Sequence, residues 1–81
     1  MPKTQVEKII QLRTLASNEL ALAIEKFPSF NSAHEGYAVI KEEVDELWEL
    51  VKANKGRSVQ AEREALQIAA MALRFVLDLR R

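Results

Sequence analysis

Two glutamates, Glu43 and Glu46, lie three residues apart in a segment that favours a helix. Residues i and i+3 share one face of a helix, roughly 5–6 Å apart at Cβ, so the two carboxylates repel each other. Their flank also carries Gly36, Val39 and Leu50. We therefore expect it to be partly buried, where paired negative charges are costly. A divalent cation between the carboxylates relieves this cost, and oxygen ligands suit Mg²⁺, Mn²⁺ or Ca²⁺.

Two further oxygen-bearing side chains, Glu64 and Gln67, follow a chain break near Gly56. In an antiparallel helical hairpin that turns at residue 56, Glu46 lies ten residues before the turn and Glu64 eight after it. Glu43 and Gln67 lie thirteen before and eleven after. The four side chains are therefore predicted to converge at two levels of one helix pair. The simpler interpretation is a solvated acidic helix, since five Glu and one Asp lie between positions 35 and 49.

The elements that position these residues are predicted to be three helices. The chain has 81 residues, too few for two domains, and only two Gly and two Pro, so residues 1–81 are expected to form one all-α domain. Thr4, Ser32 and Ser58 are predicted N-caps of helices that run to about residues 27, 53 and 79, with Gly56 capping the end of the second. The short connections predict a three-helix antiparallel bundle.

Apolar residues recur at helical spacing on all three segments. The first stripe, predicted to be core, consists of Val6, Ile9, Ile10, Leu20, Ala23, Ile24 and Phe27. The second, also a predicted core seam, consists of Tyr37, Ile40, Val44, Leu47 and Val51. The third helix is apolar on nearly all sides apart from a line of Glu64, Gln67, Met71, Arg74 and Asp78. A small domain cannot bury such a helix alone, so we expect oligomerisation to complete the bundle.

Composition excludes several classes of function. Twelve basic and twelve acidic side chains give zero formal net charge, so no overall field favours a nucleic acid polymer or an anionic membrane. The absence of Cys excludes disulfides, a thiolate metal site and a thiol nucleophile. No apolar stretch approaches the roughly 20 residues needed to span a bilayer. A cytoplasmic protein is expected.

The segments Lys41 to Leu47 and Glu64 to Gln67 resemble the MazG-like all-α nucleoside triphosphate pyrophosphohydrolases, in their short branch. The signature of that superfamily is ExxE on one helix and ExxD on the next, and the resemblance covers roughly residues 32–79. It implies Mg²⁺-dependent hydrolysis of a nucleoside triphosphate to the monophosphate and pyrophosphate in a homo-oligomer, with Mn²⁺ as the alternative to Mg²⁺. Glu43, Glu46, Glu64 and Gln67 would hold the metal, and Glu42 or Glu43 would orient or deprotonate the attacking water.

Gln67 departs from this signature, which has Asp at its position. Glutamine still offers a carbonyl oxygen but no charge, so metal–nucleotide binding is expected to be weaker. Three interpretations follow: an active enzyme with a modified site, an enzyme with altered metal demand, or a relative that binds nucleotide without turnover. A non-catalytic helical interaction module is the alternative from a different class.

Other side chains have two interpretations each. Basic residues gather around the second break and are candidates for phosphate binding or ordinary surface charge: Lys52, Lys55, Arg57 and Arg63. Tyr37 and Trp48 are candidates for stacking a base. Tyr37 also fits core packing, and Trp48 fits an oligomer interface.

Overall fold

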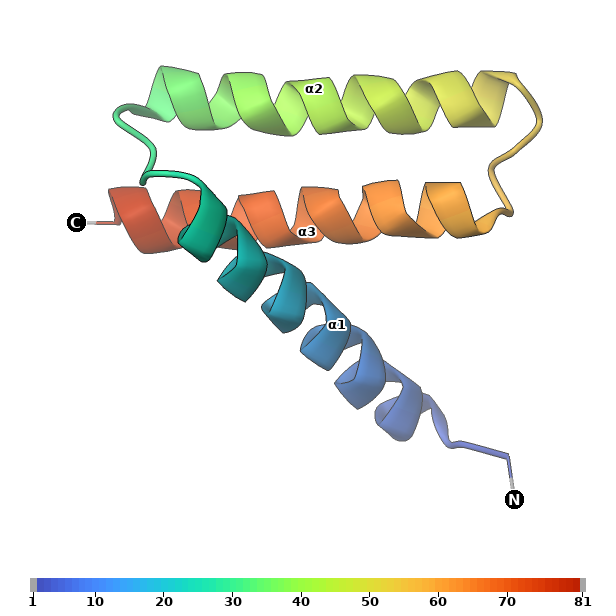
Figure 1. Cartoon of the computed structure of the whole chain (residues 1–81). Helices are drawn as coiled ribbons and strands as arrows, with labels where there is room; N and C mark the ends of the chain where they lie inside the picture. The colour runs from blue at the N-terminus through green and yellow to red at the C-terminus, as the bar shows by residue number, and fades with distance from the viewer. Residues whose placement is uncertain (1, 81) are drawn as a thin grey trace.

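Three helices make up the fold over residues 2–80, the range that the computed structural model describes: α1 (Gln5–Lys26), α2 (Ala33–Lys52) and α3 (Val59–Leu79). No strand occurs in this range, so the predicted all-α class is confirmed. Figure 1 shows α2 and α3 side by side and antiparallel, while α1 crosses α3 obliquely and its N-terminal half projects away. The radius of gyration is therefore 14.0 Å, against about 12 Å for a compact chain of this length.

Each helix begins after the hydroxyl residue that the sequence predicts. Thr4 Oγ1 accepts the N–H of Glu7 at 3.2 Å, and Ser32 Oγ accepts the N–H of Glu35 at 3.1 Å. Ser58 caps α3 in the same way. Each cap satisfies an N–H that would otherwise lack an intrahelical partner, which is worth about 1 kcal/mol.

The turn between α2 and α3 is formed by Asn54 rather than by Gly56. Asn54 has a φ of 60°, in the left-handed region, whereas Gly56 has no positive φ. The N–H of Lys55 donates to the carbonyl of Leu50 at 2.8 Å, and that of Asn54 donates to Val51 at 3.1 Å. This pair of bonds is a Schellman motif. The prediction that Gly56 caps the second helix is therefore wrong, because asparagine tolerates the left-handed conformation as well.

Gly36 allows α2 to approach α3 closely. A Cβ at this position would lie 2.7 Å from Cδ2 of Phe75 and 3.1 Å from Cδ2 of Phe30. Glycine inside a helix costs up to about 1 kcal/mol relative to alanine. Here that cost is offset by two phenyl rings that pack against the backbone of a buried position.

α1 packs on α3, and within residues 2–80 its backbone does not come close to that of α2. The hairpin of α2 and α3 has the predicted antiparallel packing, but α1 does not extend it as a third antiparallel neighbour. Ala16 on α1 and Ala70 on α3 are both buried. Small side chains such as these let neighbouring helices pack closely.

The single chain leaves most of the predicted apolar seams exposed. On α1, Val6 and Ile9 are 65% and 62% exposed, and on α2, Tyr37 is 63% exposed. The prediction that these stripes form the core is therefore wrong for the isolated chain. α3 instead buries Met71 and Arg74, from its polar line. Both α1 and α2 pack against α3.

Candidate metal centre

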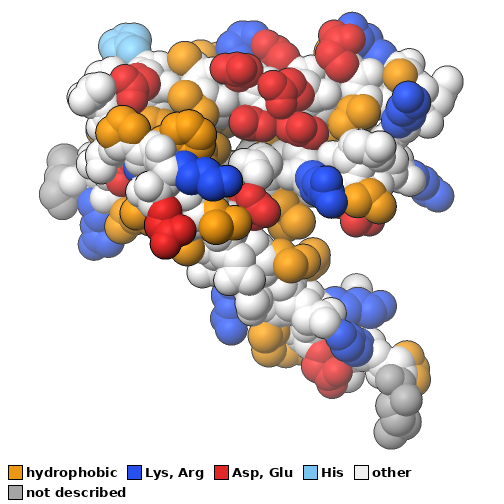
Figure 2. All heavy atoms as spheres, in the orientation of Figure 1, with side chains coloured by type: hydrophobic (Ala, Val, Ile, Leu, Met, Phe, Trp, Pro, Cys, Tyr) orange, Lys and Arg blue, Asp and Glu red, His pale blue; other side chains and the backbone are white. Residues whose placement is uncertain are grey.

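The carboxylates of Glu43, Glu46 and Glu64 come together where α2 faces α3. One oxygen from each of the three lies within 4.8 Å of the other two. Glu43 and Glu46 share a face of α2 because three residues separate them, and the hairpin register brings Glu64 opposite. Figure 2 shows acidic side chains gathered over α2 and along its border with α3. We refer to these three residues as the acidic cluster.

The acidic cluster holds negative charge without a countercharge. Burial raises the pKa of Glu43 to about 7, helped by hydrogen bonding with Glu64 and by repulsion from Glu46. Hydrogen bonding with Glu64 and repulsion from its charge also raise the pKa of Glu46. Oε2 of Glu64 is buried and has no hydrogen-bond partner. No Lys or Arg within the described part of the chain forms an ion pair with the cluster, so a bound cation would relieve all three effects.

Three carboxylate oxygens are the donors that hard divalent cations prefer. At a bond length of about 2.1 Å, adjacent oxygens around Mg²⁺ lie about 3.0 Å apart, and at least two of the three pairs of oxygens would be adjacent. The three oxygens, each within 4.8 Å of the other two, would therefore have to move closer together to bind one ion. Mg²⁺ dehydrates reluctantly, so its other coordination positions are left for waters or phosphate oxygens. The donor set fits Mg²⁺ or Mn²⁺.

A cavity of about 480 Å³ opens beside the acidic cluster. Glu42 and Glu43 line it from α2, Gln67 lines it from α3, and Phe27 and Phe30 line it from the end of α1 and the following linker. Small-molecule sites typically measure about 300–1,000 Å³. The cavity therefore joins carboxylates and aromatic rings in a volume suited to an organic ligand.

Gln67 is turned toward α1 by a residue that the sequence did not single out. Its Nε2 donates to Oε2 of Glu19 at 2.6 Å. Gln67 lines the cavity together with Glu43, so it lies near the acidic cluster. Its amide nitrogen nevertheless ties α3 to α1. An aspartate at this position, as in the MazG-like signature, would place a second carboxylate near Glu19.

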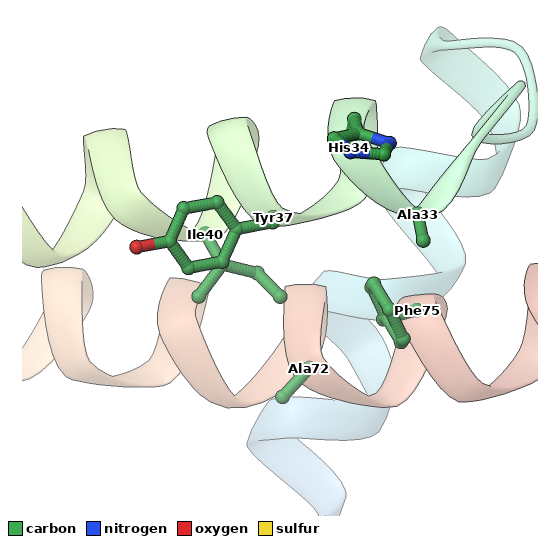
Figure 3. A pocket seen from close by; sticks show the side chains of 6 residues that line it. All are labelled: Ala33, His34, Tyr37, Ile40, Ala72 and Phe75. Carbon is green, nitrogen blue, oxygen red and sulfur yellow. The ribbon is translucent and has the colours of Figure 1, made fainter.

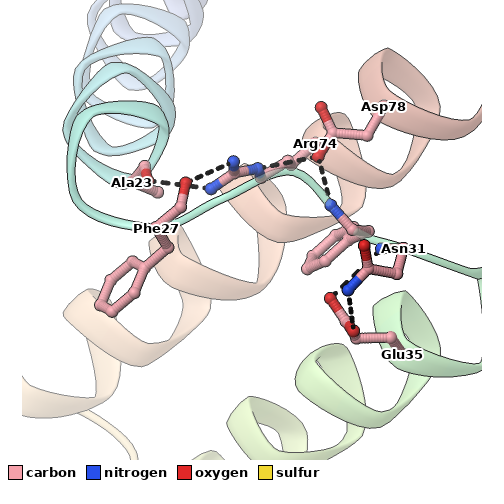
Figure 4. Close-up of polar contacts among 7 residues, drawn as sticks. Ala23, Phe27, Asn31, Glu35, Arg74 and Asp78 are labelled. Carbon is pink, nitrogen blue, oxygen red and sulfur yellow. Dashed lines mark hydrogen bonds and ion pairs between the residues drawn. The ribbon is translucent and has the colours of Figure 1, made fainter.

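Arg74 fixes the end of α1 on α3, as Figure 4 shows. Its Nη1 and Nη2 donate to the carbonyls of Ala23 and Phe27 at 2.9 and 2.8 Å, and its Nε donates to Asp78 at 2.9 Å. Arg74 therefore satisfies the carbonyl of Phe27, the residue that ends α1, and adds a second donor to the carbonyl of Ala23, which also accepts the backbone N–H of Phe27. Only 3% of its side chain is exposed, so these fixed bonds hold α1 at one wall of the cavity.

The linker after α1 is held by the same pair. The N–H of Phe30 donates to Oδ2 of Asp78 at 3.0 Å, and this bond, together with Arg74, lowers the pKa of Asp78. The guanidinium of Arg74 lies 5.6 Å from the centroid of the Phe30 ring. Asn31 is anchored by Glu35, whose carboxylate accepts both its backbone and side-chain N–H groups. Hydrogen bonds thus join the linker that carries Phe30 to both α2 and α3.

Tyr37 and Trp48, the residues predicted to stack a base, lie away from the cluster. They are about 120–140° around α2 from Glu43, at about 100° per residue. Tyr37 lines a separate apolar groove with Ile40, Ala72 and other residues (Figure 3). The rings that share a cavity with Glu43 belong to Phe27 and Phe30, which were expected to be core and linker residues.

The basic residues predicted to bind phosphates lie around the hairpin turn. Lys52 is about 180° around α2 from Glu43 and pairs with Glu49 at 2.8 Å. Its Nζ also lies 5.9 Å from the centroid of the Trp48 ring. Lys55 belongs to the turn, and Arg63 is exposed at the start of α3. Neither these three residues nor Arg57, the fourth candidate, lines the cavity beside the cluster.

Comparison with models of protein families, with curated proteins and with solved structures gave no match. Within residues 2–80, none of the helices combines the length and apolarity that crossing a membrane requires.

Proposed function

We propose that this chain is a divalent-metal-dependent nucleoside triphosphate pyrophosphohydrolase of the MazG-like type. The observation that carries the proposal is the acidic cluster, in which Glu43, Glu46 and Glu64 bring three carboxylate oxygens within 4.8 Å from two helices. The raised pKa of Glu43 and the unpartnered oxygen of Glu64 support a site that gains stability from a cation. The resemblance of the two motifs to the MazG-like signature supplies the reaction class.

The residues divide into ligands and a base in this proposal. Glu43, Glu46 and Glu64 hold the metal, which when bound neutralises phosphate charge and polarises the bond to be cleaved. Glu42 is exposed on the cavity wall beside the cluster, so it is the carboxylate free to accept a proton from water. The water oxygen bonds to the α-phosphorus as the bond to the bridging oxygen breaks, which releases nucleoside monophosphate and pyrophosphate.

The nucleoside occupies the cavity between the end of α1 and the hairpin in this proposal. Phe27 and Phe30 offer aromatic surface for the base, and Glu43 lies on the same cavity wall as Glu42. Base-stacking by Tyr37 and Trp48 stays a prediction that needs a second chain, because neither lines this cavity. Phosphate contacts by Lys52, Lys55 and Arg63 stay predictions on the same ground. A nucleotide substrate agrees with the expected cytoplasmic location.

The bundle is completed by association with further copies of the chain in this proposal. Sixteen large apolar residues of the described chain are exposed, among them Trp48. Exposed apolar area of this extent marks an interaction surface in a small domain. A homo-oligomer would cover it and would complete a MazG-like bundle.

Pyrophosphate release tests the proposal. The purified protein is incubated with each of the eight common NTPs and dNTPs and with Mg²⁺ or Mn²⁺, and pyrophosphate and monophosphate are measured. The rate of Glu46→Gln is expected to fall more than about 100-fold, because changing a residue that only hydrogen-bonds to a metal ligand already lowers metal affinity or activity by about 10–100-fold. Glu25→Gln, at an exposed position of α1, is the matched control and is expected to keep full activity.

Two outcomes would contradict the enzyme assignment. If Glu46→Gln releases pyrophosphate as fast as wild type, the activity lies outside the acidic cluster. Folded, metal-stabilised protein without any release would favour the alternative of a non-catalytic nucleotide-binding module. The bond between Gln67 and Glu19 is the observation that favours this alternative, because it takes up the side chain at the fourth motif position.

A further inference from the structure

The chain exposes far more surface than a folded monomer of its size. Its accessible area is 6559 Å² for 9.2 kDa, whereas a monomer of that mass exposes about 4,900 Å². The excess is about 1,600 Å² per chain, or about 3,200 Å² over two chains, and obligate homodimers bury about 2,000–5,000 Å² over both partners. The area that a stable dimer needs is therefore already present as uncovered surface.

A wide groove lies in the angle between α1 and α3. Its volume is about 750 Å³, and its lining is mainly apolar: Ile9, Leu12, Leu15, Ala16, Ala65 and Ala69. The alanines are small enough to let another helix approach closely, and Ile9, Leu12 and Leu15 are 62%, 54% and 48% exposed. We refer to this surface as the α1/α3 groove. It is separate from the acidic cluster, none of whose residues lines it.

The charges of the α1/α3 groove identify its occupant. Arg13 lies on the α1 side and Glu62 on the α3 side. Neither forms an ion pair within residues 2–80. In a twofold-symmetric dimer, residue i of one chain meets residue j of the other and j meets i. A groove with one cation on one helix and one anion on the other is therefore complementary to itself.

We propose that a second copy of this chain docks in the α1/α3 groove about a twofold axis, with Arg13 of each copy paired with Glu62 of the other. The proposal rests on the association proposed above and not on the metal centre. The projecting N-terminal half of α1 supplies apolar side chains to the partner's groove, which explains why this half packs so little against its own chain.

Charge reversal provides a test that an intramolecular role cannot imitate. Arg13→Glu places two acidic groups at each contact, and Glu62→Arg places two basic groups there. Each variant is expected to raise the dimer Kd by at least about tenfold, because facing like charges are strongly unfavourable. An equimolar mixture of the two variants is expected to restore the dimer, since both contacts then join opposite charges. Sedimentation equilibrium measures the mass, and circular dichroism verifies the fold of each variant.

Three outcomes would overturn the proposal. The wild-type chain at micromolar concentration could sediment as a monomer, or the mixture could fail to restore the dimer. Loss of the dimer in Tyr37→Glu together with its retention in Leu12→Glu would assign the interface to the groove that holds Tyr37. Glu46→Gln, which alters the acidic cluster alone, is expected to dimerise like wild type. A failed pyrophosphate assay would thus leave the dimer result unaffected, and a failed dimer test would leave the result of the pyrophosphate assay unaffected.

Discussion

Replacing Glu43 with glutamine is predicted to stabilise the metal-free protein at pH 8. The pKa of Glu43 rises from 4.5 to about 7 in the folded chain, so the folded state binds a proton more tightly than the unfolded state. Stability therefore falls as pH increases from about 4.5 to 7 and stays level above. Glutamine has no charge to bury, so Glu43→Gln is expected to lose this part of the pH dependence.

The size of the effect follows from the same carboxyl group. Without any discount, the increase in pKa would correspond to a loss of about 3 kcal/mol in the free energy of unfolding, at about 1.4 kcal/mol per pKa unit. The side chain is half-buried, and solvent screening reduces this figure to about 1 kcal/mol. For a chain of this size, about 1 kcal/mol corresponds to a Tm increase of about 4–8 °C.

Thermal unfolding from pH 4.5 to 8.5, with EDTA and at one fixed protein concentration, measures this prediction. Glu25→Gln is the matched control and is expected to follow wild type. Millimolar Mg²⁺ is expected to stabilise wild type and to stabilise Glu43→Gln much less, because the variant lacks a ligand. The reasoning is refuted if Glu43→Gln has the same pH dependence as wild type, or if it is less stable than wild type at pH 8 without metal.

Three further substitutions have defined outcomes. Gly36→Ala is expected to destabilise the chain by about 1 kcal/mol in denaturant unfolding, because overpacking costs about 1–3 kcal/mol and the better helix propensity of alanine returns at most about 1 kcal/mol. Adding Phe75→Leu should recover the loss, and a Gly36→Ala variant as stable as wild type would contradict the close contact. Arg74→Met should lower stability by about 2 kcal/mol or more, since it leaves the buried carboxylate of Asp78 without its ion pair and the carbonyl of Phe27 without this donor, and a buried polar group left without a partner costs about 1–3 kcal/mol. Amide exchange should accelerate first at the end of α1. Gln67→Asp should tighten Mg²⁺ binding in calorimetry only when combined with Glu19→Gln, because in the single variant the new aspartate faces the Glu19 carboxylate. Equal Mg²⁺ affinities of the single variant Gln67→Asp and the double variant would refute this.

The helix ends were predictable because their causes are local. Thr4, Ser32 and Ser58 each accept a backbone N–H from three residues ahead, and such spacing is visible in a sequence. The residue that forms the turn between α2 and α3 was not predictable, because Asn54 and Gly56 both tolerate the left-handed region. Only the backbone dihedral angles and hydrogen bonds distinguish them.

The acidic cluster was predictable because one hairpin sets its geometry. A single turn fixes the register of α2 against α3, so counting from it places Glu64 opposite Glu43 and Glu46. The placement of α1 depends on bonds between distant residues, such as the contact of Gln67 with Glu19, 48 positions away. No periodicity reports such contacts, which is why the cavity and its aromatic walls were missed.

The most direct test of the metal centre is a calorimetric titration of the metal-free protein with Mn²⁺ and Mg²⁺. Glu43, Glu46 and Glu64 are predicted to bind one ion per chain, with more protons released at pH 6.5 than at pH 8.5, because Glu43 must lose a proton whose pKa is about 7. Glu46→Gln is predicted to weaken binding by more than about tenfold, with Glu25→Gln unchanged. Absence of saturable binding, or equal binding by Glu46→Gln and wild type, would contradict the assignment of the acidic cluster as a metal site.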